Sequence, residues 1–249
     1  MGMRIEESDL NSILKTELEK IFENKNFSDL SNFQRRKCVF DYLVENSEYD
    51  FSLLNDIYSR KKQEYADEIV SVLNPKGNKK GVCNSFSYAY KLLLDKLQIP
   101  CMLVICHIAE DSVKDFQNKG VNTNTSMIVK TSSGLYMIPH MLVLVQNDDG
   151  TFSFDDITYA IFNKENERKK EFFNYNSQMA KQNKQLNPEG FDTFMLRFIV
   201  NNSKDKNYDM LFREKYEKKT GSGVLNIPFD LIKSYEEPNK IEATKETRE

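Results

Sequence analysis

Between positions 101 and 158 the chain carries a series of short apolar runs rich in β-branched residues. In order they are CMLVICHIA, SMIVK, LYMI, HMLVLV and TFSFDDIT, and turn residues separate them, such as Ser132, Ser133 and Gly134 and the segment 147–150. Runs of this length, bounded by turn signals, are typical of β-strands. Because HMLVLV lacks polar alternation, we expect both faces of at least one strand to be covered. The middle of the chain therefore predicts a sheet.

The residues before this sheet show the three- and four-residue spacing of amphipathic helices. In SDLNSILKTELEKIFENK, one apolar stripe comprises Leu10, Ile13, Leu14, Leu18, Ile21 and Phe22. Further helices are predicted in FQRRKCVFDYLVENSEYD, in EYADEIVSVLN, which ends before Pro75, and from about Asn84 to about Leu97. Helices that precede a sheet in this way predict an α+β fold.

The pattern also divides the chain into parts. We expect a helical N-terminal part over 1–75, packed on a core over 76–235, and a solvated, disordered tail over 236–249. After the sheet we expect a charged helix from about Asn163 to Leu186, a strand at FMLRFIV and a helix near Met210 to Lys219.

Composition excludes several classes of function. The 35 Lys and Arg against 38 Asp and Glu give a net charge of −3, which disfavours a nucleic-acid partner that would need a basic surface. There is no run of about 18 apolar residues and no signal-peptide pattern, so we expect neither a membrane span nor a leader. The 17 Phe and 12 Tyr supply the apolar surface of a folded core.

The four cysteines are Cys38, Cys83, Cys101 and Cys106, and they show neither a CxxC pair nor metal-finger spacing. We therefore expect no disulfide framework, no metal and no cofactor. Reduced thiols suit a cytoplasmic protein, or equally one that acts inside a host cell. Cys101 and Cys106 are predicted to lie in the core, and Cys38 on the apolar face of a helix.

Cys83 follows Gly81 and Val82 and stands directly before the helix predicted from Asn84. The unpaired amides and the dipole at a helix start favour a thiolate there. The same amides can donate hydrogen bonds to the oxyanion of a tetrahedral intermediate. Cys83 is therefore a candidate nucleophile, although a cysteine before a helix is more often a small buried residue.

A thiol nucleophile needs a base, and the chain contains only two histidines, His107 and His140. His140 is expected to open the strand HMLVLV, and Asp156 ends the next strand after the NDDG turn. An antiparallel hairpin of this length can bring the Asp156 carboxylate beside the imidazole of His140. There the carboxylate would hold the ring in the tautomer that the reaction needs and stabilise its charged form. His107 beside Cys106 is a weaker dyad or metal pair, because adjacent strand residues face opposite ways.

Two further assignments remain open at this level. Strand alternation places Asp156 on one face of its strand and Asp155 on the other, so only one of them is expected to face His140. Asp156 is also suited to cap a turn. The basic run Arg35, Arg36 and Lys37, like the charged segment NKENERKK, is interpreted as a solvated face.

These segments carry a family resemblance. GVCNSFSYAYKLLLDKLQIPCMLVI resembles the nucleophile segment of the transglutaminase-like superfamily, a Gly-x-Cys followed by a helix, a Gly-Ile-Pro-like turn and a strand. HMLVLVQNDDGTFSFDDIT is similar to its second half, with Asp156, Ile157 and Thr158 as the Asp-x-Thr. VFDYLVENSEYD resembles the helix before the core in many bacterial members. The resemblance covers roughly 34–158, and Leu142 and Tyr159 stand where many relatives have Trp.

The resemblance implies a papain-like α+β core over 76–235 with Cys83 as nucleophile, His140 as general base and acid, and Asp156 as the orienting carboxylate. It implies acyl transfer or hydrolysis at an amide bond of a protein or peptide, as a peptidase, deamidase or transglutaminase. The stretch 109–138 would then be an insertion able to act as a lid or as a substrate loop. An inactive binding module and acetyl transfer from acetyl-CoA, as in arylamine N-acetyltransferases, remain alternatives.

Overall fold

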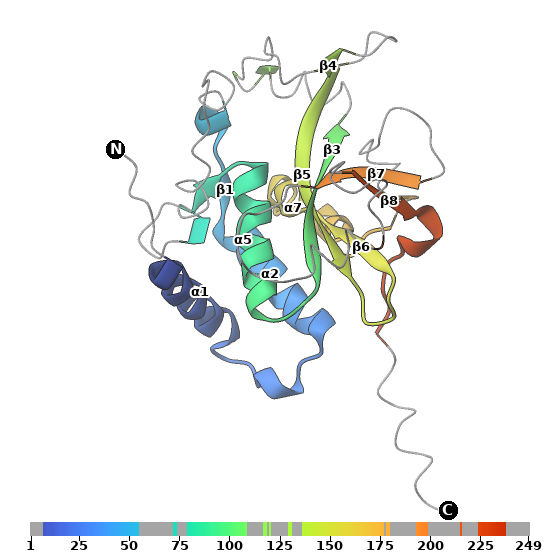
Figure 1. The fold of residues 1–249 in the computed structure, drawn as a ribbon. Coiled ribbons are helices and arrows are strands. Elements are labelled where there is room, and N and C mark those ends of the chain that lie inside the picture. The colour runs from blue at the N-terminus through green and yellow to red at the C-terminus, as the bar shows by residue number, and fades with distance from the viewer. Residues whose placement is uncertain are drawn as a thin grey trace, which may run out of the picture.

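The computed structural model describes residues 7–54, 72–73, 79–108, 117–118, 120, 129–130, 136–176, 178–179, 193–198, 215 and 224–237. Within these ranges the chain is an α+β protein, as the sequence predicts. Figure 1 shows helices α1, α2 and α5 gathered on one side of the long strands β3 and β5, with β7 and β8 beyond β3. No helix in the described ranges is both long and apolar enough to cross a bilayer.

The first two helices form where the sequence predicts them. Helix α1 spans Glu7–Phe22, the 3-10 turn η1 spans Phe27–Asp29, and helix α2 spans Asn32–Asn46. Helix α2 begins with a capping box, because the Ser31 hydroxyl accepts from the Gln34 amide at 3.1 Å and the Gln34 side chain accepts from the Ser31 amide at 3.1 Å. Both helices bury their apolar stripes in the core.

A short parallel pair, β1 (Glu48–Tyr49) and β2 (Lys80–Gly81), leads into helix α5 (Cys83–Lys96). Helix α5 confirms the buried helix predicted from about Asn84 to about Leu97. Its side chains Phe86, Tyr90 and Leu93 are fully excluded from solvent. The helix ends at Lys96, with Leu97 as its C-cap, and the chain then enters the sheet at Cys101.

The sheet has the order β4-β5-β3-β7-β8, and β6 also pairs with β5. The strands are β3 (Cys101–Ile108), β4 (Val129–Lys130), β5 (Tyr136–Gln146), β6 (Phe152–Asp155), β7 (Thr193–Phe198) and β8 (Val224–Pro228), and their pairings are antiparallel. Eight successive pairs join β3 to β5. Both faces of β5 are covered, as predicted: Met141 and Val143 belong to the core under the helices, and Leu142 and Leu144 to a second core on the other face.

The structure corrects two predicted elements. Residues 136–138 of LYMI and the run HMLVLV form one strand, so His140 lies inside β5 and does not open it; pairing with β3 continues through Pro139 and Ile138. The charged helix predicted from Asn163 is absent over 163–176, where the chain forms turns and the 3-10 helix η2 (Glu167–Phe172). This segment lacks an apolar stripe, and the Asn166 side chain accepts from the Arg168 amide to start the 3-10 turn.

Two elements complete the described fold. Helix α7 spans Ile157–Phe162, directly after β6, and the 3-10 turn η3 spans Phe229–Leu231. Several predictions lie wholly or mostly outside the described residues: the helix in EYADEIVSVLN, of which only the helical 72–73 are described, the helix near 210–219, the stretch 109–138 apart from its few described residues, and the tail beyond 237.

Candidate active site

Cys83 is the first residue of α5, and glycine at position 81 makes the close entry to this helix possible. A Cβ on Gly81 would lie 2.7 Å from the Cβ of Ser85 and 3.0 Å from a methyl group of Val72, closer than real side chains approach. The Ser85 hydroxyl accepts from the Val82 amide at 3.2 Å. These contacts fix the helix start, so the Cys83 thiol is held at the N-terminal end of α5, where it is partly exposed.

His140 lies at a gap along one edge of β5. On that edge β4 pairs with Tyr136 and Met137, and β6 pairs from Val143 onward, so no described strand pairs with the residues between them. The imidazole is buried, with 3% of its surface exposed. Its Nε2 lies 2.7 Å from Oδ2 of Asp156, and the Cys83 side chain is close enough to contribute to the raised pKa of the ring. Since Nε2 contacts Asp156, Nδ1 is the nitrogen left for Cys83.

The two carboxylate oxygens of Asp156 have different partners. Oδ1 accepts from the Tyr159 amide at 3.0 Å and so caps helix α7, while Oδ2 contacts His140. The side chain is fully buried. The two interpretations of Asp156 from the sequence, as a cap and as the partner of an imidazole, therefore both hold.

The surroundings of His140 favour its charged form. Burial alone lowers the pKa of an imidazole, but the Asp156 carboxylate and the Cys83 side chain outweigh it and raise the pKa of His140 from 6.5 to about 10. The Tyr159 ring also meets the imidazole edge-on, with the ring centroids 5.3 Å apart and the planes at 82°. These contacts therefore favour the imidazolium form of His140 at neutral pH.

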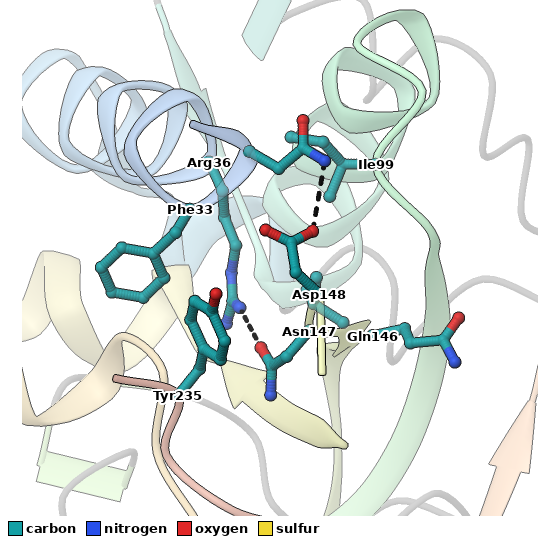
Figure 2. A pocket seen from close by; sticks show the side chains of 9 residues that line it. Phe33, Arg36, Ile99, Gln146, Asn147, Asp148 and Tyr235 are labelled. Atoms are coloured by element: carbon teal, nitrogen blue, oxygen red, sulfur yellow. Dashed lines mark hydrogen bonds between the residues drawn. The ribbon is translucent and has the colours of Figure 1, made fainter. Parts of the chain in front are cut away.

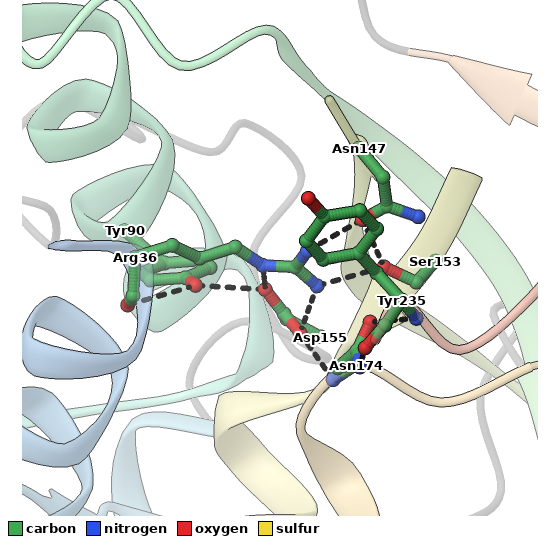
Figure 3. A network of polar contacts seen from close by, with 7 residues as sticks. All are labelled: Arg36, Tyr90, Asn147, Ser153, Asp155, Asn174 and Tyr235. Carbon is green, nitrogen blue, oxygen red and sulfur yellow. Dashed lines mark hydrogen bonds and ion pairs between the residues drawn. The ribbon is translucent and has the colours of Figure 1, made fainter. Parts of the chain in front are cut away.

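Asp155 has a different set of partners. Its carboxylate forms an ion pair with Arg36 at 2.6 Å and accepts from the Tyr90 hydroxyl at 2.7 Å (Figure 3). The interpretation of Arg36 as part of a solvated face is therefore wrong, since only 2% of its side chain is exposed. Lys37 of the same run and Arg168 of the segment NKENERKK are exposed, as expected.

The sequence pattern around Arg36 indicates that this residue is buried. Arg36 stands three residues after Phe33 and four before Phe40, so it falls within the apolar stripe of α2. An arginine in such a stripe implies a buried carboxylate as its partner. That partner, Asp155, is 119 positions away, and the sequence pattern alone did not identify it.

The other cysteines are placed differently from Cys83. Cys101 and Cys106 are buried in the core and Cys38 packs against it, as predicted. Burial raises the pKa of the Cys106 thiol, and the charges of Asp156 and Cys83 raise it further. Burial likewise raises the pKa of Cys38. For His107 the structure describes only the backbone in β3, so its side chain lies outside the description.

The described residues also include a pocket away from His140, and they form no metal centre. Within the described ranges no three His, Cys, Asp or Glu residues gather closely enough to hold a metal ion. One pocket lies beside Arg36, where α2 meets the turn between β5 and β6; Asn147 accepts from Arg36 at 3.0 Å there, and Asn32 donates to Asp148 at 3.3 Å (Figure 2). Neither His140 nor Asp156 lines this pocket, so we regard it as separate from the candidate active site.

Comparisons with known proteins add little. No protein-family model and no curated protein matches the chain. One solved structure, described as the crystal structure of a TGase, is similar to it with a TM-score of 0.40 and 15% sequence identity. The match covers 63% of this chain and 34% of that protein, so the chain spans about a third of that protein's length. Any function must therefore be inferred from the geometry of the site.

Proposed function

We propose that this chain is an enzyme that uses a cysteine thiolate for acyl transfer or hydrolysis at an amide bond of a protein or peptide. Cys83 is the nucleophile, His140 the general base and acid, and Asp156 the carboxylate that orients the imidazole. The observation that carries the proposal is the buried imidazole of His140, held 2.7 Å from the Asp156 carboxylate, with a pKa that the Cys83 side chain at the start of α5 also helps to raise.

The first half of the reaction follows from the charges. With the pKa of His140 raised to about 10, the imidazolium form is favoured at neutral pH, and in the proposed mechanism it pairs with the sulfur of Cys83 as the nucleophile. The sulfur attacks the amide carbonyl, and amides at the start of α5 donate to the oxyanion that forms. His140 then gives its proton to the leaving nitrogen, the C–N bond breaks, and the acyl group remains on Cys83 as a thioester.

The second half depends on the acceptor. When water attacks the thioester, His140 takes its proton, and the enzyme acts as a peptidase or deamidase. When a primary amine attacks, the product is a new amide, and the enzyme acts as a transglutaminase. In both cases Asp156 keeps the ring in the orientation in which Nδ1 faces the sulfur.

The arrangement of the elements supports a division of the chain for this function. We propose that 76–235 forms a transglutaminase-like catalytic core and that 1–75 packs on it. In support, α2 of the N-terminal part contacts α5 and α7, the helices that begin at Cys83 and directly after Asp156.

Thiol labelling tests the proposal. The protein is mixed with limiting iodoacetamide at pH 7, and mass spectrometry follows each cysteine separately. We expect Cys83 to react fastest and the replacement His140→Gln to slow it. Cys38 is the matched control, because it is also partly buried but burial raises the pKa of its thiol. Labelling of Cys83 no faster than Cys38 would contradict the proposal and favour an inactive binding module.

A second experiment identifies the acceptor. A library of glutamine-containing and other peptides is incubated with the protein in water enriched in ¹⁸O, with and without a labelled primary amine. Incorporation of ¹⁸O indicates hydrolysis, and incorporation of the amine indicates transamidation. The replacement Cys83→Ser must abolish both. An acetyl adduct on Cys83 after mixing with acetyl-CoA would favour acetyl transfer instead.

A further inference from the structure

We propose that Arg36 and Asp155 are positioning residues, whose buried ion pair holds the end of β6 so that Asp156 keeps its contact with His140. This inference rests on the proposed function of His140 and Asp156. The sequence resemblance assigns no role to either residue of the pair. Neither of them belongs to the three side chains that would carry out the reaction.

Asp155 accepts four hydrogen bonds in the structure (Figure 3). Arg36 binds both carboxylate oxygens, with Nε to Oδ2 and Nη2 to Oδ1 each at 2.6 Å. The Tyr90 hydroxyl donates to Oδ2 and the Asn174 amide donates to Oδ1, each at 2.7 Å. The donors come from α2, from α5 and from the segment after η2. One carboxylate therefore ties three parts of the fold to the last residue of β6.

The partners of Asp155 are themselves held in place. The Arg36 guanidinium also donates to Asn147 at 3.0 Å and to Ser153 at 2.9 Å, and it lies over the Phe173 ring at 5.0 Å. Because several contacts fix the guanidinium, its bidentate bonds hold Asp155 in one orientation.

The next residue along the chain is Asp156, and its position follows from that of Asp155. Consecutive residues at the end of a strand point to opposite faces. A rotation of the backbone that moved Asp156 away from His140 would turn Asp155 out of its ion pair. The Asp156 amide also donates to the carbonyl of Phe172 at 2.9 Å. The junction of β6 and α7 is thus held by two contacts, the ion pair of Asp155 and the backbone hydrogen bond of Asp156.

A purely stabilising role explains the arrangement less well. Replacing a buried ion pair with apolar residues often leaves stability unchanged or increases it, so such a pair gives little net stability. The directional hydrogen bonds of such an ion pair do, however, fix the orientation of its two side chains. Asp155 also immediately precedes Asp156, the carboxylate whose distance to the imidazole matters for the proposed reaction.

The test measures His140 directly. With only two histidines in the chain, ¹⁵N NMR of the imidazoles, assigned with His140→Gln, gives the pKa of His140 in each variant. The double replacement Arg36→Met with Asp155→Leu removes both charges together and leaves no buried charge without a partner. We expect it to lower the pKa of His140 by about one unit or more and to slow alkylation of Cys83 about tenfold.

Tyr90→Phe is the milder variant, because it removes one of the four donors to Asp155, and we expect a smaller shift in the same direction. Its matched control is Tyr42→Phe, which deletes the hydroxyl that donates to Glu17 at 2.7 Å between α1 and α2. This control loses a tyrosine–carboxylate bond of the same kind without touching Asp155. We expect the pKa of His140 to stay unchanged in it.

Each outcome decides the question. A lowered pKa of His140 in the Asp155 and Tyr90 variants, with none in Tyr42→Phe, supports the positioning role. An unchanged pKa in folded variants overturns it. If the double variant fails to fold, Tyr90→Phe alone decides. If Cys83 is unreactive in the parent protein, the proposed function fails, but the pKa of His140 still tests whether the ion pair positions Asp156.

Discussion

The two oxygens of Asp156 allow its two roles to be separated by substitution. Asp156→Asn retains an oxygen that can accept from the Tyr159 amide, but it loses the negative charge that faces His140. Its amide group would then donate to Nε2, which fixes the opposite tautomer and leaves Nδ1 unable to accept a proton from Cys83. Asp156→Ala removes the charge and also removes the cap of α7.

The structure gives magnitudes for both changes. A pKa of about 10 for His140 corresponds to about 4 kcal/mol of net stabilisation of the imidazolium at pH 7, in which the effects of Asp156 and Cys83 exceed the opposing effect of burial. Without the carboxylate, burial lowers the pKa of the imidazole and the ring becomes neutral. Asp156→Ala should cost about 1 kcal/mol more than Asp156→Asn, the usual value of an N-cap. Both variants should lower the alkylation rate of Cys83 by about two orders of magnitude or more.

Two measurements check this prediction. A quenched time course of alkylation, followed by mass spectrometry, gives the alkylation rate of Cys83. Urea denaturation gives the free energy of unfolding, and both are measured at pH 7. We expect Asp156→Asn and Asp156→Ala to have equally low alkylation rates at Cys83 but different free energies of unfolding. A wild-type rate in Asp156→Asn would show that the carboxylate acts only as a helix cap, and the proposed role in catalysis would be refuted. Equal stabilities of the two variants would instead refute the cap.

Three further predictions concern stability. Native His140 holds a proton that the unfolded chain releases above about pH 6.5, so the contribution of His140 to the free energy of unfolding is complete below that pH and is lost as the pH rises to about 10. A pH series of urea denaturation should therefore show the free energy of unfolding fall by up to about 1.4 kcal/mol per pH unit in this range. The replacement His140→Gln should remove this fall. Gly81→Ala should destabilise the protein by about 1–3 kcal/mol, because its Cβ would meet Ser85 at 2.7 Å; an unchanged melting temperature would contradict this. Arg36→Ala should cost about 3–5 kcal/mol, because it leaves the buried charge of Asp155 uncompensated, and Asp155→Asn in the same chain should recover part of that loss.

Local patterns were sufficient to predict several parts of this fold. The periodicity of residues 84–97 predicted α5, and the apolar runs predicted β3 and the hairpin of β5 and β6, since a turn and a two-residue period define a hairpin locally. The same alternation separated Asp155 from Asp156. Alternation indicated only that one of the two faces His140, and the choice of Asp156 came from the sequence resemblance.

Other features depend on contacts that no local pattern records. The pairing of Arg36 with Asp155 spans 119 positions, and only the packing of α2 against β6 brings the two together. LYMI and HMLVLV join into one strand because β3 continues to pair with both. The helix predicted from Asn163 fails because its polar side chains bond to nearby backbone and end the helical turns early.

The identity of each partner matters for the charge of the candidate site. Asp155 and Asp156 are adjacent and both fully buried, and Arg36 keeps its positive charge at any pH relevant to the protein. It therefore neutralises Asp155 and leaves the charge of Asp156 for His140. Without Arg36, two adjacent buried carboxylates would lie beside the site without a compensating charge. A cation that cannot be titrated is thus better suited beside Asp155 than a second histidine or a lysine.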